Sequence, residues 1–93
     1  MFNAALVSGL VTNSWSVKSS MSQARYGLGV VVLDDKIYAI GGYADDGVVG
    51  TNECYDPVSD TWAILASMPT PRACFAIAAC QGKIYCMGGE TLD

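Results

Sequence analysis

The 93-residue chain repeats part of its own sequence at a fixed offset of 47 residues. Of the 46 residue pairs that can be compared at this offset, eleven are identical. The identities include Trp15 and Trp62, Met21 and Met68, Arg25 and Arg72, Lys36-Ile37-Tyr38 and Lys83-Ile84-Tyr85, and Gly41-Gly42 and Gly88-Gly89. A period of this length is typical of solenoids, propellers and repeat arrays. The repeat therefore restricts the chain to an architecture built from similar, stacked units.

Each period contains short apolar runs that are typical of β-strands and not of helices. The runs are rich in Val, Ile and Tyr, and frequent glycines and three prolines separate them. We expect strands at residues 26–33, 36–42, 51–56 and 61–66, and a repeat of the first pair at 73–89. Two-residue turns, Asp34-Asp35 and Gln81-Gly82, close the two hairpins. The predicted fold class is all-β, with four-stranded antiparallel sheets.

The first strand of each period is apolar on both faces. Residues 27–33 and 74–80 show no alternation of apolar and polar side chains, so such a strand must be covered on two sides. A single four-stranded meander cannot cover its own first strand in this way. We therefore expect successive meanders to stack face to face, as the blades of a β-propeller do around their axis.

Charge and hydropathy argue against two classes of partner. The net charge is -4, from nine acidic and five basic residues, and Lys and Arg form no cluster. A protein that binds phosphate backbones needs such a basic patch, so we expect no nucleic acid partner. The longest apolar runs, at 26–33 and 73–80, fall far short of the roughly 18 residues that a membrane-spanning helix needs. We therefore expect no membrane partner.

The cysteine pattern argues against a metal centre. The four cysteines (Cys54, Cys74, Cys80 and Cys86) form no CxxC motif, and the chain has no histidine. In the predicted second hairpin Cys86 pairs opposite Ile77 and lies on the other face from Cys74 and Cys80. We interpret the cysteines as small buried hydrophobic residues of a reducing, cytoplasmic or nuclear compartment.

We also expect no catalytic activity and no cofactor. No Ser, Cys or carboxylate is paired with a recognisable base, and the histidine-free sequence disfavours a metal enzyme.

The period, the double glycine that follows Lys-Ile-Tyr-Ala-Ile, and the spacing of Tyr55 and Trp62 together resemble the Kelch repeat. The match runs from Arg25 to Trp62 and begins again at Met68-Pro69-Thr70-Pro71-Arg72. The resemblance implies a fragment of a Kelch-type β-propeller with one four-stranded antiparallel blade per repeat. It divides the chain into a complete blade at 24–66, the first half of the next blade at 67–93, and a partial blade at 12–23. Residues 1–11 are expected to be a divergent lead-in, because they lack the Asn-Glu-Cys-Tyr-Asp-Pro motif found at 52–57.

Most signature residues have a structural interpretation. Glycines allow close backbone approach or a positive φ where a strand ends, and large aromatic side chains pack between blades. We assign structural roles to Trp15, Tyr38, Gly41, Gly42, Tyr55, Trp62, Tyr85, Gly88 and Gly89.

Candidate partner-binding residues are expected at one end of the blade. In an up-and-down meander the loop at 43–50 and the segment that leads into each first strand lie at the same end, and binding residues are often on such loops. The resemblance implies peptide contacts from Arg25, Tyr43, Thr51 and Arg72, with Glu90 in the place of Tyr43 in the next repeat. The loop adds Asp45 and Asp46. The alternative is that Arg25 and Arg72 pair with local carboxylates such as Asp45 or Asp46.

The resemblance favours a protein-interaction module that binds a protein or peptide ligand. Residues 52–62 and 67–72 are most similar to the substrate-recruiting Kelch domains of BTB-Kelch adaptors, which join cullin-type ubiquitin ligases through BTB and BACK segments that are absent from this chain. One alternative is a Kelch protein that binds actin or the cytoskeleton, although an acidic chain is a poor general match for acidic actin. Another is a truncated, non-functional fragment, and a third is that several chains complete blades between them.

Overall fold

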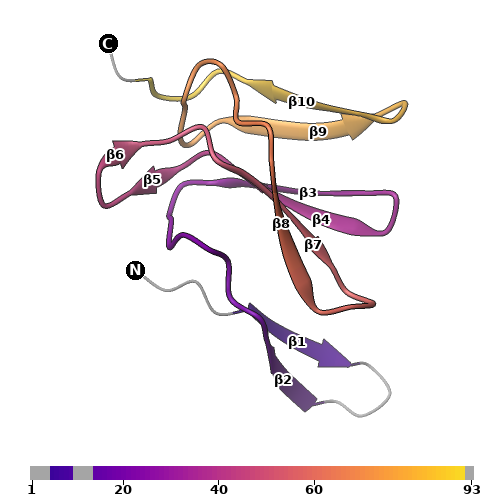
Figure 1. Ribbon diagram of the computed structural model, residues 1–93. Coiled ribbons are helices and arrows are strands. Elements are labelled where there is room, and N and C mark those ends of the chain that lie inside the picture. Colours follow the sequence, from indigo (N-terminus) through magenta and orange to yellow (C-terminus); the bar gives the residue numbers. More distant parts are fainter. Residues whose placement is uncertain (1–4, 10–13, 92–93) are drawn as a thin grey trace.

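The computed structural model describes residues 5–9 and 14–91 (Figure 1). In these residues the chain forms strands and turns without a helix, so no helix is available to cross a membrane. The strands are β1 (Ala5–Gly9), β2 (Ser14–Lys18), β3 (Gly29–Leu33), β4 (Lys36–Ile40), β5 (Tyr43–Ala44), β6 (Gly47–Val48), β7 (Asn52–Asp56), β8 (Thr61–Leu65), β9 (Ala76–Cys80) and β10 (Lys83–Met87). The predicted all-β class is confirmed.

The centre of the chain forms one complete four-stranded antiparallel blade in the order β3-β4-β7-β8. Asp34 and Asp35 form the turn between β3 and β4 with φ of 53° and 61°, the left-handed conformation that a two-residue hairpin turn requires at both positions. Aspartate tolerates this conformation better than most residues. The sequence therefore predicted both the blade and its first turn correctly.

The loop after β4 contains a small hairpin that the sequence analysis did not predict. Strands β5 and β6 pair through Tyr43 with Val48 and Ala44 with Gly47, and Asp45 and Asp46 form the turn between them. The hairpin projects from one end of the blade (Figure 1).

The hairpins on either side repeat the geometry of the complete blade. Strands β9 and β10 pair antiparallel, with Cys86 opposite Ile77 as predicted. Strands β1 and β2 pair with Ser8 opposite Trp15, and this pair lies 47 residues before the pair of Tyr55 and Trp62. The structure therefore places a strand inside the predicted lead-in, although its sequence lacks the motif of β7. The domain boundaries given above stay a prediction.

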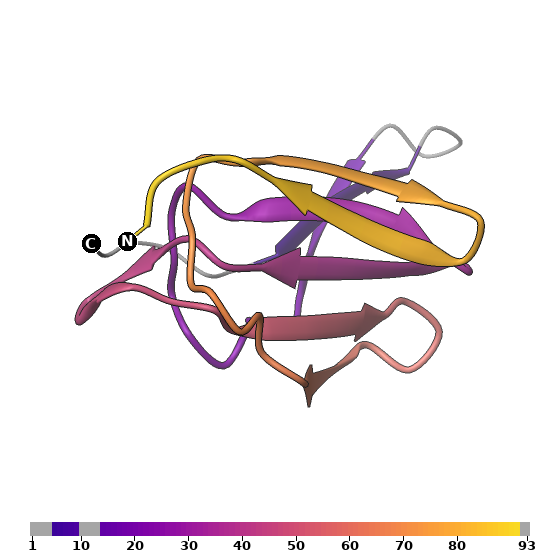
Figure 2. The same cartoon turned by 90° about the horizontal axis from the view of Figure 1, so that it is seen from above.

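The second hairpin stacks on the first strand of the complete blade. Strand β3 contacts β9 and β10, and the β9-β10 hairpin overlies β3 and β4 when the molecule is seen from above (Figure 2). A methyl group added at Gly29 would lie 2.8 Å from the Phe75 ring. Glycine is therefore needed where the two blades approach closely.

The stacking covers one face of β3 only. On the other face Val30 and Val32 remain 56% and 61% exposed in the described part of the chain. The prediction that this strand is covered on two sides is therefore met on the side of β9 alone.

The cysteines differ in their burial. All four are free; Cys54 is buried and Cys86 is half-buried, whereas Cys74 and Cys80 are exposed. The expectation of four buried thiols is wrong for Cys74 and Cys80. Cys80 lies on the outer face of the β9-β10 hairpin, and Cys74 lies in the loop before it. Within the described residues no group of three His, Cys, Asp or Glu side chains is arranged to hold a metal ion.

Candidate partner-binding face

The longer connections gather at one end of the blades. The β5-β6 hairpin and the segment between β8 and β9 lie at the end opposite the turns that close β3-β4 and β9-β10 (Figure 1). We call this end the loop face and define it by Tyr26, residues 43–50 and Glu90. Most of the predicted contact residues come from these segments.

Arg25 does not lie on the loop face but inside the complete blade. Its side chain is fully buried, and its guanidinium donates hydrogen bonds to the carbonyl oxygens of Gly41 and Thr51, both at 2.9 Å, and of Ala39 at 3.2 Å. In this position Arg25 fastens the segment before β3 to β4 and to the start of β7. The predicted contact with a partner is therefore corrected to a structural role.

The ionic partner of Arg25 is Glu53 on β7. Arg25 Nη2 lies 2.9 Å from Glu53 Oε2, and both side chains are completely shielded from solvent. The second carboxylate oxygen accepts the backbone N–H of Ser22 at 2.9 Å. Burial lowers the pKa of Arg25, and the charge of Glu53 and its hydrogen bond act against this shift. Glu53 stands in the Asn-Glu-Cys-Tyr-Asp-Pro motif, but the sequence analysis gave it no role of its own.

Thr51 lies at the entry to β7. Its hydroxyl donates to Gln23 Oε1 at 2.9 Å, and its carbonyl oxygen accepts the bond from Arg25. Thr51 is half-buried, so its polar groups support the loop connection from within.

Tyr43 joins the two stacked blades at the loop face. Its ring stacks on Tyr26 with a centroid distance of 5.1 Å, and its hydroxyl donates a hydrogen bond to the Glu90 carboxylate. This bond is the main reason that the pKa of Tyr43 rises to about 12. Tyr26 is 57% exposed. Tyr43 and Glu90 occupy equivalent positions of the two repeats, but their contact was not predicted from the sequence.

Asp45 and Asp46 lie at the exposed tip of the β5-β6 hairpin. Among the described residues, Arg25 and Glu53 form the one ion pair. Neither aspartate therefore pairs with Arg25 or Arg72. Both carboxylates are therefore available at the loop face.

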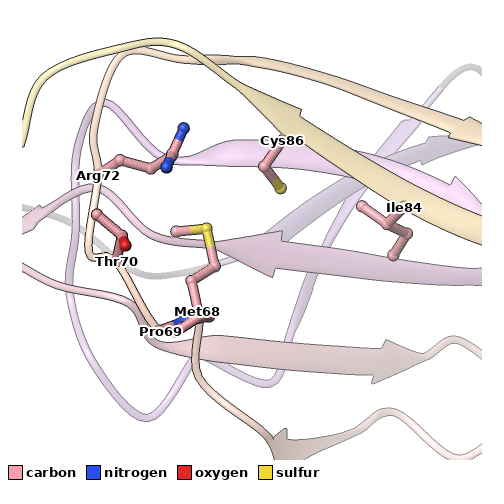
Figure 3. Close-up of a pocket in the computed structure, with 6 residues that line it drawn as sticks. All are labelled: Met68, Pro69, Thr70, Arg72, Ile84 and Cys86. Carbon is pink, nitrogen blue, oxygen red and sulfur yellow. The ribbon is translucent and has the colours of Figure 1, made fainter.

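Arg72 occupies the position of Arg25 in the next repeat. Its Nη1 donates to the Gly88 carbonyl oxygen at 3.1 Å, which repeats the bond from Arg25 to Gly41 at an offset of 47 residues. Arg72 is only half-buried, and it lines a hollow of about 250 Å³ between the segment before β9 and strand β10 (Figure 3).

The aromatic signature residues lie away from the loop face. Trp62 packs on Tyr55 with a centroid distance of 5.0 Å, and its indole N–H donates to the Ser19 carbonyl oxygen at 2.8 Å. Asp60 accepts hydrogen bonds from the backbone N–H of Ser19 and the hydroxyl of Tyr55. These contacts fasten the first hairpin to the complete blade. Trp15, at the equivalent position, is 70% exposed.

The other signature residues lie along the strands. Tyr38 is half-buried in β4, and Tyr85 is 45% exposed in β10. The four glycines that follow β4 and β10, Gly41, Gly42, Gly88 and Gly89, all have positive φ between 68° and 101°.

Comparison with known proteins agrees with this arrangement. The repeated, stacked antiparallel meanders define part of a β-propeller. Residues 24–69 match the family model described as Kelch motif. The structure is similar to a solved structure titled "Structure of YjhT", with a TM-score of 0.75 and 22% sequence identity over 84% of this chain. The match covers 25% of that chain, so this chain spans about a quarter of its length.

The described fold is therefore part of a β-propeller, and residues 24–69 are similar to the Kelch motif. Kelch repeats generally act as protein-interaction modules.

Proposed function

We propose that the loop face binds a protein or peptide ligand and forms part of the binding surface of a longer propeller. The observation that carries the proposal is the Tyr26-Tyr43-Glu90 cluster, which combines an exposed aromatic stack with a carboxylate from the neighbouring blade. Amphipathic aromatic side chains are enriched where proteins bind one another. The rigid blades beneath hold the cluster in place.

The charge of the loop face favours a basic ligand. Asp45, Asp46 and Glu90 are exposed, whereas Arg25 is buried and Arg72 lies at the side hollow. Carboxylates attract arginine and lysine side chains, and opposite charges steer association. We therefore propose a segment that places a basic side chain beside these acids and an apolar or aromatic side chain on Tyr26 and Tyr43.

The test compares two labelled peptides of equal length that differ by a central arginine or glutamate next to a tyrosine. We expect the arginine peptide to bind about tenfold more tightly at low salt, and the difference to shrink as salt screens the charges. Glu90→Gln should weaken its binding. Asp35→Asn is the matched control, because Asp35 is an exposed acid in the turn at the opposite end of the blade. Equal binding of both peptides would refute the proposed ligand chemistry.

For the full-length protein we propose substrate recognition in a ubiquitin ligase adaptor of the BTB-Kelch type. The support is the similarity of residues 52–62 and 67–72 to that subgroup. The test is affinity purification of the full-length protein followed by detection of a cullin. Recovery of a cullin that is lost when a BTB segment is deleted supports the proposal. A full-length protein that co-purifies no cullin contradicts it.

A further inference from the structure

The connection from β2 to β3 begins with an exposed serine whose polar groups all bind the complete blade. The N–H of Ser19 donates to Asp60 Oδ1 and its hydroxyl donates to the Asp60 carbonyl oxygen, both at 2.9 Å. Its own carbonyl oxygen accepts the indole N–H of Trp62 at 2.8 Å. Asp60 lies in the turn between β7 and β8, and Trp62 lies in β8. These bonds therefore link the end of the β1-β2 hairpin to the complete blade (Figure 1).

The exposure of Ser19 does not follow from where the sequence begins. The equivalent residue of the next repeat is Ala66, which follows β8 of the complete blade. Ser19 is exposed although the complete blade lies against it, and Ala66 is exposed although all four strands of its own blade are present. Neither a residue's own blade nor the next blade therefore covers this position. We expect the hydroxyl of Ser19 to stay accessible when the neighbouring repeats are present.

Ser19 offers a reactive group that its repeat equivalent lacks. Ala66 has no hydroxyl, so the side-chain bond to the neighbouring blade is specific to the first of the two connections. Ser19 also lies outside the regular strands, directly after the end of β2. Connecting segments open locally at a lower free-energy cost than strands inside a sheet do. An exposed hydroxyl in such a segment is chemically suited to transfer of a phosphoryl group.

A phosphate at this position would turn the attraction between Ser19 and Asp60 into repulsion. The hydrogen bond from the Ser19 N–H is the main reason that the pKa of Asp60 lies below its usual range, so this carboxylate is charged at neutral pH. A phosphoserine carries about -1.5 to -2 charges, and next to an aspartate it disrupts by repulsion between like charges. The modified Oγ also has no hydrogen to donate, so the Asp60 carbonyl oxygen would lose its donor.

We propose that Ser19 is a phosphorylation site and that its phosphorylation releases the end of the β1-β2 hairpin from the complete blade. A serine kinase would supply the phosphoryl group from ATP. The new bond joins Ser19 Oγ to the γ-phosphorus, and the bond from that phosphorus to the bridging oxygen breaks. ADP leaves with the electron pair of the broken bond, and the hydroxyl proton passes to the carboxylate base of the kinase. The site lies outside the loop face, so the proposal goes beyond the function proposed above and does not depend on it.

The first experiment measures the effect of the modification on the full chain, prepared by chemical synthesis with phosphoserine at position 19. The readout is hydrogen exchange of the Trp62 indole N–H in NMR spectra, which should become about tenfold faster when the bond to Ser19 is lost. The matched control carries phosphoserine at position 20, because Ser20 is the next exposed serine of the same connection, and it should keep the slow exchange. Unchanged exchange with the phosphate at position 19 would overturn the proposal.

Amide chemical shifts separate local release from general unfolding of the phosphorylated chain. The signals of Ser19 and Asp60 should move, whereas those of β3, β4, β9 and β10 should keep their positions. Loss of the folded spectrum as a whole contradicts a local release.

The second experiment tests whether the folded chain can be modified at this position. The full chain is incubated with ATP and a panel of purified serine kinases, including kinases that select a basic residue before the serine, as Lys18 is here. Mass spectrometry should place phosphate on Ser19, and Ser19→Ala should abolish this signal while Ser20→Ala preserves it. Phosphate on other serines alone, or on none, would contradict the proposal. Glu90→Gln weakens the ligand of the loop face but should change neither readout, so the two proposals fail separately.

Discussion

The buried pair of Arg25 and Glu53 predicts that Glu53→Gln strongly destabilises the chain. Glutamine has nearly the same shape, so the change tests charge and hydrogen bonding and not packing. Its single carbonyl oxygen can face Arg25 Nη2, but its amide group then meets the N–H of Ser22, donor against donor. The guanidinium is left buried without its counter-charge.

The expected cost is about 3–5 kcal/mol, which is typical of removing one partner of a buried ion pair. A domain of this size has a total stability of about 5–15 kcal/mol. Glu53→Gln should therefore remove a large share of the stability of the complete blade. Urea unfolding followed by tryptophan fluorescence measures the loss, because Trp62 packs on Tyr55, which follows Glu53 by two residues in the same strand.

The matched control is Asp46→Asn, which removes the same charge at an exposed turn. It should change the free energy of unfolding by no more than about 0.5 kcal/mol. The double variant Arg25→Met with Glu53→Leu replaces the pair with apolar groups and should be more stable than Glu53→Gln alone. A cost below about 1 kcal/mol for Glu53→Gln would refute the view that this pair holds the blade together.

Three further predictions concern single positions. Gly41→Ala should cost more stability in thermal unfolding than Gly88→Ala: both have φ near 70°, but a methyl group at Gly41 would lie 2.6 Å from a backbone oxygen, whereas the space at Gly88 is open. Glu90→Gln should lower the pKa of Tyr43 from about 12 toward its ordinary value near 10, measured by NMR titration of the tyrosine ring, because it removes the carboxylate that accepts the hydroxyl. Asp60→Asn should flatten the loss of stability in acid. Hydrogen bonds, first from a backbone N–H, hold the pKa of Asp60 below its usual range, so its contribution is present above the unfolded-state pKa of about 3.9 and is lost as pH falls through the folded-state pKa.

The sequence was sufficient to predict features that depend on neighbouring residues. The offset of 47 residues, the short apolar runs and the turn residues Asp34-Asp35 predicted the complete blade, because turn type and β-propensity are local properties. The β5-β6 hairpin was missed because two-residue strands have no alternation to detect. Its signal was Gly47 directly after Asp45-Asp46, because glycine readily adopts the positive φ of 109° found where the turn meets β6.

Strand β1 shows a different limit of sequence comparison. Its sequence lacks the motif of β7, yet it pairs with β2 in the same register as β7 pairs with β8. Backbone hydrogen bonds form the ladder, and they do not require particular side chains. A motif search is therefore too strict a test for the presence of a strand.

Arg25 and Arg72 explain why the candidate site was harder to predict than the fold. Both arginines open the first strand of a repeat, and both donate to the carbonyl oxygen of the equivalent glycine. Their burial differs because Glu53, 28 residues away, covers one of them and no described residue covers the other. Whether this arginine forms an internal ion pair thus depends on whether a glutamate-bearing strand lies beside it. The glutamate is carried by the third strand of the blade. The residues next to the arginine in the sequence therefore do not predict whether the arginine is paired.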